Sequence, residues 1–220
     1  MAEELVSGCW WFDLGGVNAY LVADGDELVL VDAGTPWDAD DVRAAVAATG
    51  HSPADIDRVL VTHYDVDHVG GLSKLGLDAP VYVGSGDAAV LGGEAEPPLS
   101  NRKGLFQRVA GLFVDHLASV EPVEDGDTVG SFTVYETPGH TPGHVAYVSR
   151  DRGIAFLGDL VRESNGDLEA SPWALSYDTG DVRESIRHLL VDGVAFDVAC
   201  VGHGRPLVTG GEKALSRALD

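Results

Sequence analysis

The chain has 220 residues, of which 36 are acidic and 14 are basic, and its formal net charge is −22. This charge argues against a nucleic-acid partner, because phosphate binding requires clustered Lys and Arg. The sequence contains no run of about 18 apolar residues and no basic region followed by an apolar one at its start. We therefore expect one soluble, cytoplasmic domain with no membrane segment, long enough to bury a large core.

The acidic composition resembles that of proteins from salt-loving archaea. Concentrated salt screens and solvates a dense negative surface, whereas dilute buffer leaves its charges to repel one another. The basic set contains only three lysines, Lys74, Lys103 and Lys213. We interpret the chain as halophilic, with an ordinary acidic enzyme as the alternative.

The first third of the chain predicts three short strands followed by a helix and a fourth strand. These strands are expected to pair antiparallel, with a turn at 23–26 between the last two. They span residues 5–13, 17–23 and 27–32. From Asp38 the apolar spacing becomes helical and ends before Gly50, and residues 58–62 read as the next strand. Cys9 and Cys200 stand alone among apolar neighbours, so we expect buried free thiols and neither a disulfide nor a redox pair.

A metal-binding loop is predicted directly after the strand at 58–62. His63, Asp65, Asp67 and His68 lie within six residues, and imidazole and carboxylate together suit zinc, iron or manganese. With the two-residue repeat of an extended chain, His63, Asp65 and Asp67 project to one side, and His68 opens the following turn. The alternative is a polar turn in an acidic chain.

The middle of the chain predicts a helix at 69–75, a strand at 80–83 and an added segment at about 84–120. Apolar residues recur at helical spacing in this segment, and three basic residues fall within seven positions of it. The segment would pack on the core, cover the metal site as a lid, or pair two subunits. The apolar residues are Leu105, Phe106, Val109, Leu112, Phe113 and Leu117, and the basic ones are Arg102, Lys103 and Arg108.

The second half repeats the pattern of strands and helices. Strands are expected at 131–136, 145–149, 154–157 and 197–201, with helices at 181–191 and from Gly211. Asp181 and Glu184 form a start similar to a capping box. His140, Asp159 and His203 each follow one of these strands, so all the donors lie at strand ends, where a rigid sheet holds loop ligands in place.

These motifs resemble the metallo-β-lactamase superfamily over nearly the whole chain. The resemblance rests on the segments at 18–22 and 29–34 and on the spacing of the four donor groups at 63–68, 140, 159 and 203. It implies an α/β fold with a four-layer αββα sandwich, as a single domain over residues 1–220. The chain is similar to the compact members related to glyoxalase II and to lactonases.

The resemblance also implies two metal sites. The first would take His63, Asp65 and His140, the second would take Asp67, His68 and His203, and Asp159 would bridge both. Two divalent ions would be bound, with zinc as the first expectation and iron or manganese as alternatives. His144 is expected to support or pack rather than to bind a metal, and Asp32 is expected to hold the ligand loop by hydrogen bonds.

Asp65 departs from the family's commonest pattern, which has histidine at this position. A further carboxylate brings the expected ligands to four histidines and three aspartates, and its harder oxygen favours iron or manganese over zinc. The di-iron members use glutamate there. Aspartate is shorter, and if it does not reach, the first site is weak and the protein works with one metal.

These expectations favour a metal-dependent hydrolase that directs a metal-activated hydroxide at a small thioester, lactone or related ester. Asp67 or Asp159 would orient the nucleophile and pass its proton to the leaving group. Tyr177, after Pro172 and Trp173, would offer a hydroxyl to the oxyanion. The alternative is a non-haem iron oxygenase or redox protein of the same fold. The partner would be a small molecule, and the chain would act as a monomer or homodimer.

Overall fold

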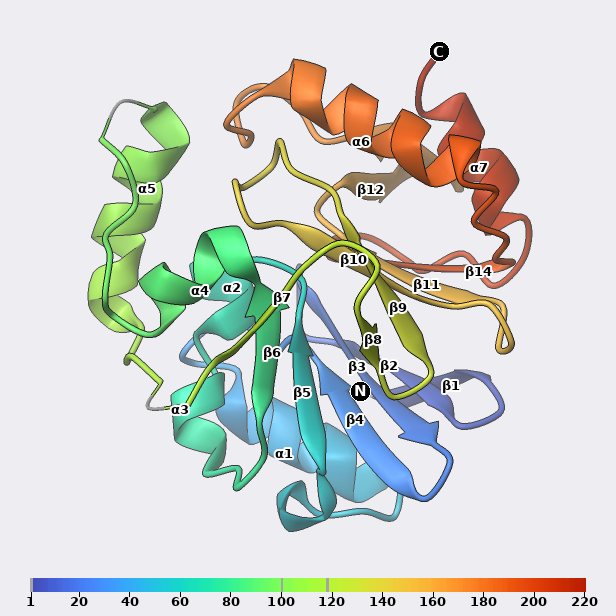
Figure 1. Ribbon diagram of the computed structural model, residues 1–220. Coiled ribbons are helices and arrows are strands. Elements are labelled where there is room, and N and C mark those ends of the chain that lie inside the picture. Colours follow the sequence, from blue (N-terminus) through green and yellow to red (C-terminus); the bar gives the residue numbers. More distant parts are fainter. Residues whose placement is uncertain (1, 100, 118) are drawn as a thin grey trace.

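Two β-sheets packed face to face form the centre of the molecule in the computed structural model, which describes residues 2–99, 101–117 and 119–220 (Figure 1). The first sheet has seven strands in chain order, and its first four are antiparallel while β4 to β7 are parallel. Its strands are β1 (Ala2–Val6), β2 (Cys9–Asp13), β3 (Asn18–Asp24), β4 (Glu27–Val31), β5 (Arg58–Val61), β6 (Val81–Gly84) and β7 (Glu121–Val123).

The second sheet has the order β14-β11-β10-β9-β8, and only β11 and β14 run parallel. Beside it, β12 and β13 form a small hairpin. These strands are β8 (Thr128–Val129), β9 (Phe132–Glu136), β10 (Val145–Ser149), β11 (Ile154–Gly158), β12 (Val161–Ser164), β13 (Asp167–Ala170) and β14 (Val198–Val201).

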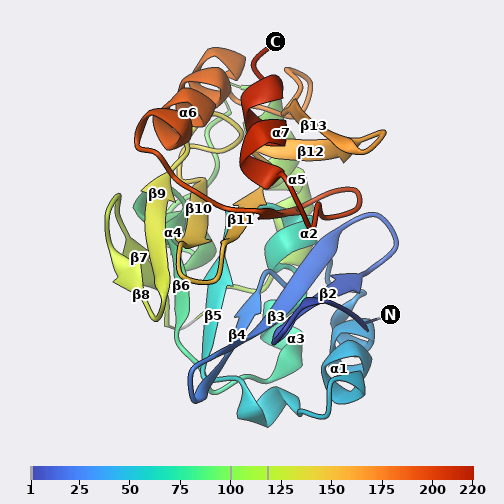
Figure 2. The ribbon, with the colours of Figure 1, turned by 90° about the vertical axis from the view of Figure 1, so that its right-hand side faces the viewer.

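Helices cover the outer faces of both sheets, so that the sheets lie between two helical layers (Figures 1 and 2). α1 (Ala39–Ala48) and α3 (Leu72–Leu75) pack on the first sheet, and α6 (Thr179–Val191) and α7 (Gly211–Arg217) pack on the second. The shorter elements are η1 (Pro53–Asp55), α2 (Val66–Val69), α4 (Ser85–Leu91), α5 (Arg102–Ala110) and η2 (Gly111–Phe113). None of the helices in the described ranges is both long and apolar enough to cross a bilayer.

Three separate apolar clusters fill the spaces between the four layers. Along β3, Leu21 points into the cluster beneath α1, whereas Tyr20 and Val22 point into the cluster between the sheets. Along β10, Tyr147 faces the cluster between the sheets, and Val148 faces the cluster under α6 and α7. Both faces of these strands are buried, because helices cover the side that the other sheet leaves open. The predicted αββα sandwich is confirmed.

Most expected elements are present, with three corrections. The strand expected at 5–13 is a hairpin, because Gly8 has a φ of +70° and turns the chain between β1 and β2. Of the helix expected at 69–75, residues 72–75 form α3, whereas Val69 is the last residue of α2, which begins earlier at Val66. α6 begins earlier than expected, because Asp178 is its N-cap and accepts from the amides of Gly180 and Asp181.

Both cysteines are buried and free, as expected. They nevertheless lie in the same cluster between the two sheets, on β2 and β14. Burial raises the pKa of the Cys200 thiol, and the neighbouring Cys9 raises it further. The Cys200 thiol therefore stays protonated, and both buried cysteines pack as small apolar side chains.

Candidate metal centre

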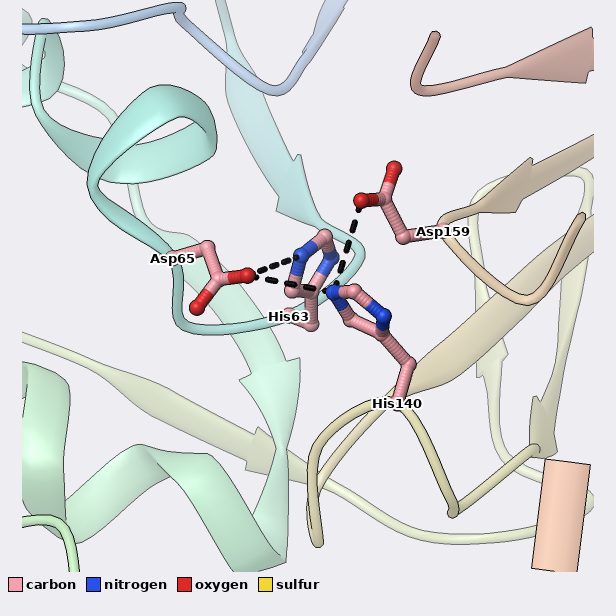
Figure 3. A group of neighbouring side chains, drawn as sticks. All are labelled: His63, Asp65, His140 and Asp159. Atoms are coloured by element: carbon pink, nitrogen blue, oxygen red, sulfur yellow. Dashed lines mark hydrogen bonds and ion pairs between the residues drawn. The ribbon is translucent and has the colours of Figure 1, made fainter. Parts of the chain in front are cut away.

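The seven predicted donors lie together at one end of the two sheets, in two groups. The first group contains His63, Asp65, His140 and Asp159, and the second contains Asp67, His68 and His203. In each group, one donor atom per residue lies within 4.8 Å of every other. Figure 3 shows the first group, with His63 and Asp65 on the loop after β5 and with His140 and Asp159 reaching in from loops of the second sheet.

Asp159 connects the two groups. Its Oδ2 lies 3.4 Å from His140 Nε2 and 3.2 Å from His203 Nε2, and its Oδ1 lies 3.5 Å from His68 Nε2. His203 Nε2 is also 3.4 Å from Asp67 Oδ2. This is the position that the resemblance implies for a bridging carboxylate.

All four donor histidines are held through Nδ1, which leaves Nε2 directed toward the other donors. An oxygen that accepts from Nδ1–H fixes the tautomer and places the lone pair on Nε2, as in most metal-binding histidines. The acceptors are Thr62 Oγ1 for His63 at 3.0 Å, Asp32 Oδ2 for His68 at 2.9 Å, Ser171 Oγ for His140 at 2.9 Å and the Gly16 carbonyl for His203 at 2.6 Å.

Asp32 and His144 have the supporting roles expected from the sequence. Asp32 accepts from the amide and the hydroxyl of Thr62 at 2.9 and 2.8 Å, in addition to His68. His144 Nδ1 lies 2.8 Å from Thr137 Oγ1, and its Nε2 accepts from the Asp159 amide at 3.1 Å. Because both nitrogens of His144 have protein partners, it is not a metal donor here.

The second group fits a metal ion. Within the described part of the chain, two buried atoms beside this group, His68 Nε2 and Asp159 Oδ1, make no hydrogen bond. Buried polar atoms are otherwise nearly always paired, so these atoms indicate a missing partner. A Cβ on Gly202 would lie 2.0 Å from Asp159 Oδ1, so the glycine leaves room for this carboxylate. The two imidazoles of His68 and His203 and the two carboxylates of Asp67 and Asp159 suit a divalent ion.

In the first group, Lys103 reaches in from the first turn of α5. Its Nζ lies 2.5 Å from Asp65 Oδ2 and 2.5 Å from His140 Nε2, and the side chain is 6% exposed. Although burial opposes ionisation, Lys103 and His140 hold the pKa of Asp65 well below its usual range. Asp65 is therefore an ionised carboxylate paired with an ammonium group.

Gln107, one turn further along α5, binds the other oxygen of Asp65. Its Nε2 donates to Asp65 Oδ1 at 2.8 Å and to the Tyr64 carbonyl at 2.5 Å, and its Oε1 accepts from the Tyr177 hydroxyl at 2.6 Å. Both oxygens of Asp65 thus have partners on one helix. Tyr177 is directed at Gln107, and burial raises the pKa of its hydroxyl; its contact with an oxyanion stays a prediction.

Of the three alternatives left open for this segment, packing of the apolar face of α5 on the core does not occur. Leu105, Phe106, Val109, Leu112 and Phe113 are all more than half exposed, whereas Lys103, Gly104 and Gln107 are buried. Trp173, in the loop after β13, is exposed as well, with Arg102 over its ring at 5.4 Å. The segment at 84–120 therefore reaches the metal centre with its polar side chains.

Sequence reasoning missed the roles of Lys103, Gln107 and Ser171. The segment 102–108 contains three basic residues, but their spacing does not indicate that Lys103 is the one that points into the metal centre. One signal was available, since Lys103 and Gln107 are four residues apart and therefore share a helix face. No sequence pattern indicates the role of Ser171. Its hydroxyl reaches His140 only because of the path of the loop after β13, which the sequence does not predict.

Two packed sheets with two groups of candidate metal donors at one end give the framework of a metal-dependent enzyme. A model of the metallo-beta-lactamase superfamily matches residues 12–203. The chain therefore belongs to the metallo-beta-lactamase superfamily.

Relatives and solved structures agree with this assignment. The probable metallo-hydrolase YybB of Bacillus subtilis (strain 168) is 29% identical over 196 residues, which cover 87% of this chain and 82% of the relative. The hydroxyacylglutathione hydrolase of Bdellovibrio bacteriovorus is 32% identical over 113 residues, covering 49% of this chain and 35% of that protein. The structure of TTHA1623 in a di-iron-bound form has a TM-score of 0.68 and 30% identity, and the match covers 90% of this chain and 92% of that one.

Proposed function

We propose that the protein hydrolyses a small thioester, lactone or related ester at the group formed by Asp67, His68 and His203. The observation that carries this proposal is a cavity of about 250 Å³ whose wall includes Asp159 and His203. Val161, Pro172 and Leu175 supply its apolar lining. Pockets for drug-sized ligands measure roughly 300–1,000 Å³, so this cavity suits a smaller acyl group.

The donors would hold one divalent ion beside this cavity, with zinc as the first expectation. Such an ion supplies a nucleophile at neutral pH by lowering the pKa of a water molecule. Burial raises the pKa of the Asp159 carboxyl, but the nearby His68 and His140 outweigh burial and hold this pKa well below its usual range. Asp159 is therefore ionised. Asp159 and Asp67 can then accept the proton of the attacking water and return it to the leaving group.

Similarity to the hydroxyacylglutathione hydrolase supports a thioester, but this similarity covers only half of the chain. The alternative, iron-dependent oxidation, is supported by the di-iron-bound form of TTHA1623. Asp65 was the residue that favoured iron, and here both of its oxygens bind α5. We therefore place hydrolysis first.

The test compares His203→Ala with His188→Ala, which removes a partly exposed histidine of α6 that lies outside both donor groups. Each purified protein is loaded with zinc, iron or manganese and assayed with a hydroxyacyl thioester of glutathione and with a simple lactone. We expect wild type and His188→Ala to turn over at least one substrate, and His203→Ala to lose 100-fold or more. Colourless zinc protein with no ester or thioester turnover, or iron protein that consumes oxygen, would contradict the proposal.

A further inference from the structure

The first donor group already contains a positive charge, the ammonium group of Lys103. Lys103 Nζ lies 2.5 Å from both Asp65 Oδ2 and His140 Nε2, and these two acceptors are 3.1 Å apart. His140 donates its Nδ1–H to Ser171, so the Nε2 lone pair that a metal would use is the one that accepts from the ammonium group. The positive charge stands where the resemblance would place the first metal ion.

We propose that Lys103 takes the place of the first metal ion and that the protein binds a single divalent ion, at Asp67, His68, His203 and Asp159. This replaces the two-ion expectation. The inference rests on the proposed metal centre but does not depend on which substrate is cleaved.

The way α5 is anchored shows that this lysine is held in place. Asn101 caps the helix by accepting from the Lys103 amide at 2.8 Å and ties it to the Tyr177 carbonyl at 2.9 Å. A Cβ on Gly104 would lie 2.0 Å from the Pro98 carbonyl, so the helix packs against its neighbouring loop at backbone distance. Gln107 holds Asp65 from the other side.

Charge balance agrees with one ion. Asp65, Asp67 and Asp159 carry three negative charges among the seven donors. One ammonium group and one divalent ion neutralise them, whereas a second divalent ion beside Lys103 would leave two excess positive charges in a buried site. Two cations sharing the acceptors Asp65 and His140 would also repel each other at close range.

The same geometry predicts what removal of the lysine does. His63 Nε2 is buried without a hydrogen bond in the described structure, and it lies 3.3 Å from Asp65 Oδ2. Without Lys103, the donors His63, Asp65, His140 and Asp159 form a complete first site. Lys103→Ala should therefore create a second binding position.

The experiment counts bound zinc by mass spectrometry after loading with excess zinc and desalting. We expect one equivalent in wild type, two in Lys103→Ala, and one in Lys103→Arg, which keeps the charge. Lys213→Ala, an exposed lysine on α7, is the matched control and should retain one. Circular dichroism checks the fold, and Lys103→Met, which keeps the apolar stem, replaces the alanine variant if that variant does not fold.

Two equivalents in wild type would overturn the inference whatever the variants do. One equivalent in a folded Lys103→Ala protein would show that the lysine does not exclude the second ion. The count needs no substrate, so its failure is distinct from failure of the proposed hydrolysis. A protein with one ion and no esterase or thioesterase activity would contradict only the proposed function.

Discussion

Asp32 combines a strained backbone with a side chain that organises the metal centre. Its φ of +55° is in the left-handed region, which a residue other than glycine rarely adopts. Its carboxylate binds both Thr62 and His68, and Thr62 in turn accepts from His63. The surrounding hydrogen bonds therefore hold a conformation that costs about 1–3 kcal/mol.

We predict that Asp32→Asn weakens zinc binding by roughly 10- to 100-fold, the usual effect of losing a carboxylate behind a metal-binding histidine. An amide has only one acceptor oxygen and cannot bind both Thr62 and His68 as the carboxylate does. Competition with a chromophoric chelator measures the affinity. Asp57→Asn, at the opposite end of β5, is the control and should bind zinc as wild type does. An unchanged affinity in Asp32→Asn would show that Asp32 does not orient the ligands.

Asp65 and Lys103 form a buried ion pair, and its energetics can be tested separately from metal content. Asp65→Asn should lower the free energy of unfolding by about 3–5 kcal/mol, because it leaves an ammonium group buried without its counter-charge. The double variant Asp65→Asn/Lys103→Met should be more stable than Asp65→Asn alone. Urea unfolding of metal-free protein measures both. Additive effects of the two substitutions would mean that the residues do not interact.

All seven donors could be predicted, because each lies in a loop that follows an apolar strand and strand ends meet at one edge of a sheet. The spacing after β5 was enough to predict His63, Asp65, Asp67 and His68. The ends of β9, β11 and β14 were enough to predict His140, Asp159 and His203. Asp65 lies in the predicted group, but its contacts with Lys103 and Gln107 were not predicted. Its partners come from α5, and sequence spacing holds no information about where that helix docks.

At the scale of elements, α5 buries polar residues and exposes apolar ones. The usual rule places an apolar stripe against the core, and it failed here because the surface under α5 is a cluster of charged donors. Phe113, just after this helix, packs its ring 5.8 Å from that of Trp37, which is also exposed. The strands β7, β8, β12 and β13 were missed as well. They are two to four residues long, and all except β8 carry charged or Pro residues.

We predict that Gly104→Ala destabilises the protein by about 1–3 kcal/mol through overpacking. In an ordinary helix interior the same change would stabilise by roughly 0.8–1.0 kcal/mol. The added Cβ would meet the Pro98 carbonyl at 2.0 Å and the Tyr177 hydroxyl at 2.7 Å. Gly92→Ala, whose nearest contact would be the Ala88 carbonyl at 3.4 Å, is the control and should be close to neutral. Thermal and urea unfolding measure both; a more stable Gly104→Ala would mean that α5 does not pack this closely.

At the scale of the whole molecule, the four layers could be predicted because strands and helices have different apolar periods. Residues alternate between two buried spaces along β3 and β10, which only a sheet covered on both faces allows. The order of strands in each sheet was not predicted, since the same periods fit many topologies.

The net charge of −22 leads to a prediction about salt. Raising KCl from roughly 0.1 M, where the Debye length is about 10 Å, to about 3 M should screen the repulsion among surface carboxylates. Each kcal/mol of stability gained raises the melting temperature by roughly 2–4 °C at this size, so we expect an increase of several degrees. Scanning calorimetry at both concentrations measures it, and a melting temperature that does not rise would contradict the halophilic interpretation.

The metal centre draws its donors from both sheets, and this has a consequence for the order of events during synthesis. The loop after β5 leaves the ribosome with His63, Asp65, Asp67 and His68, while His140, Asp159 and His203 are still to be made. Domains fold as units and their earlier parts emerge first. The complete set of donors therefore exists only after β14 has paired with β11, when every strand of the first sheet has already been synthesised.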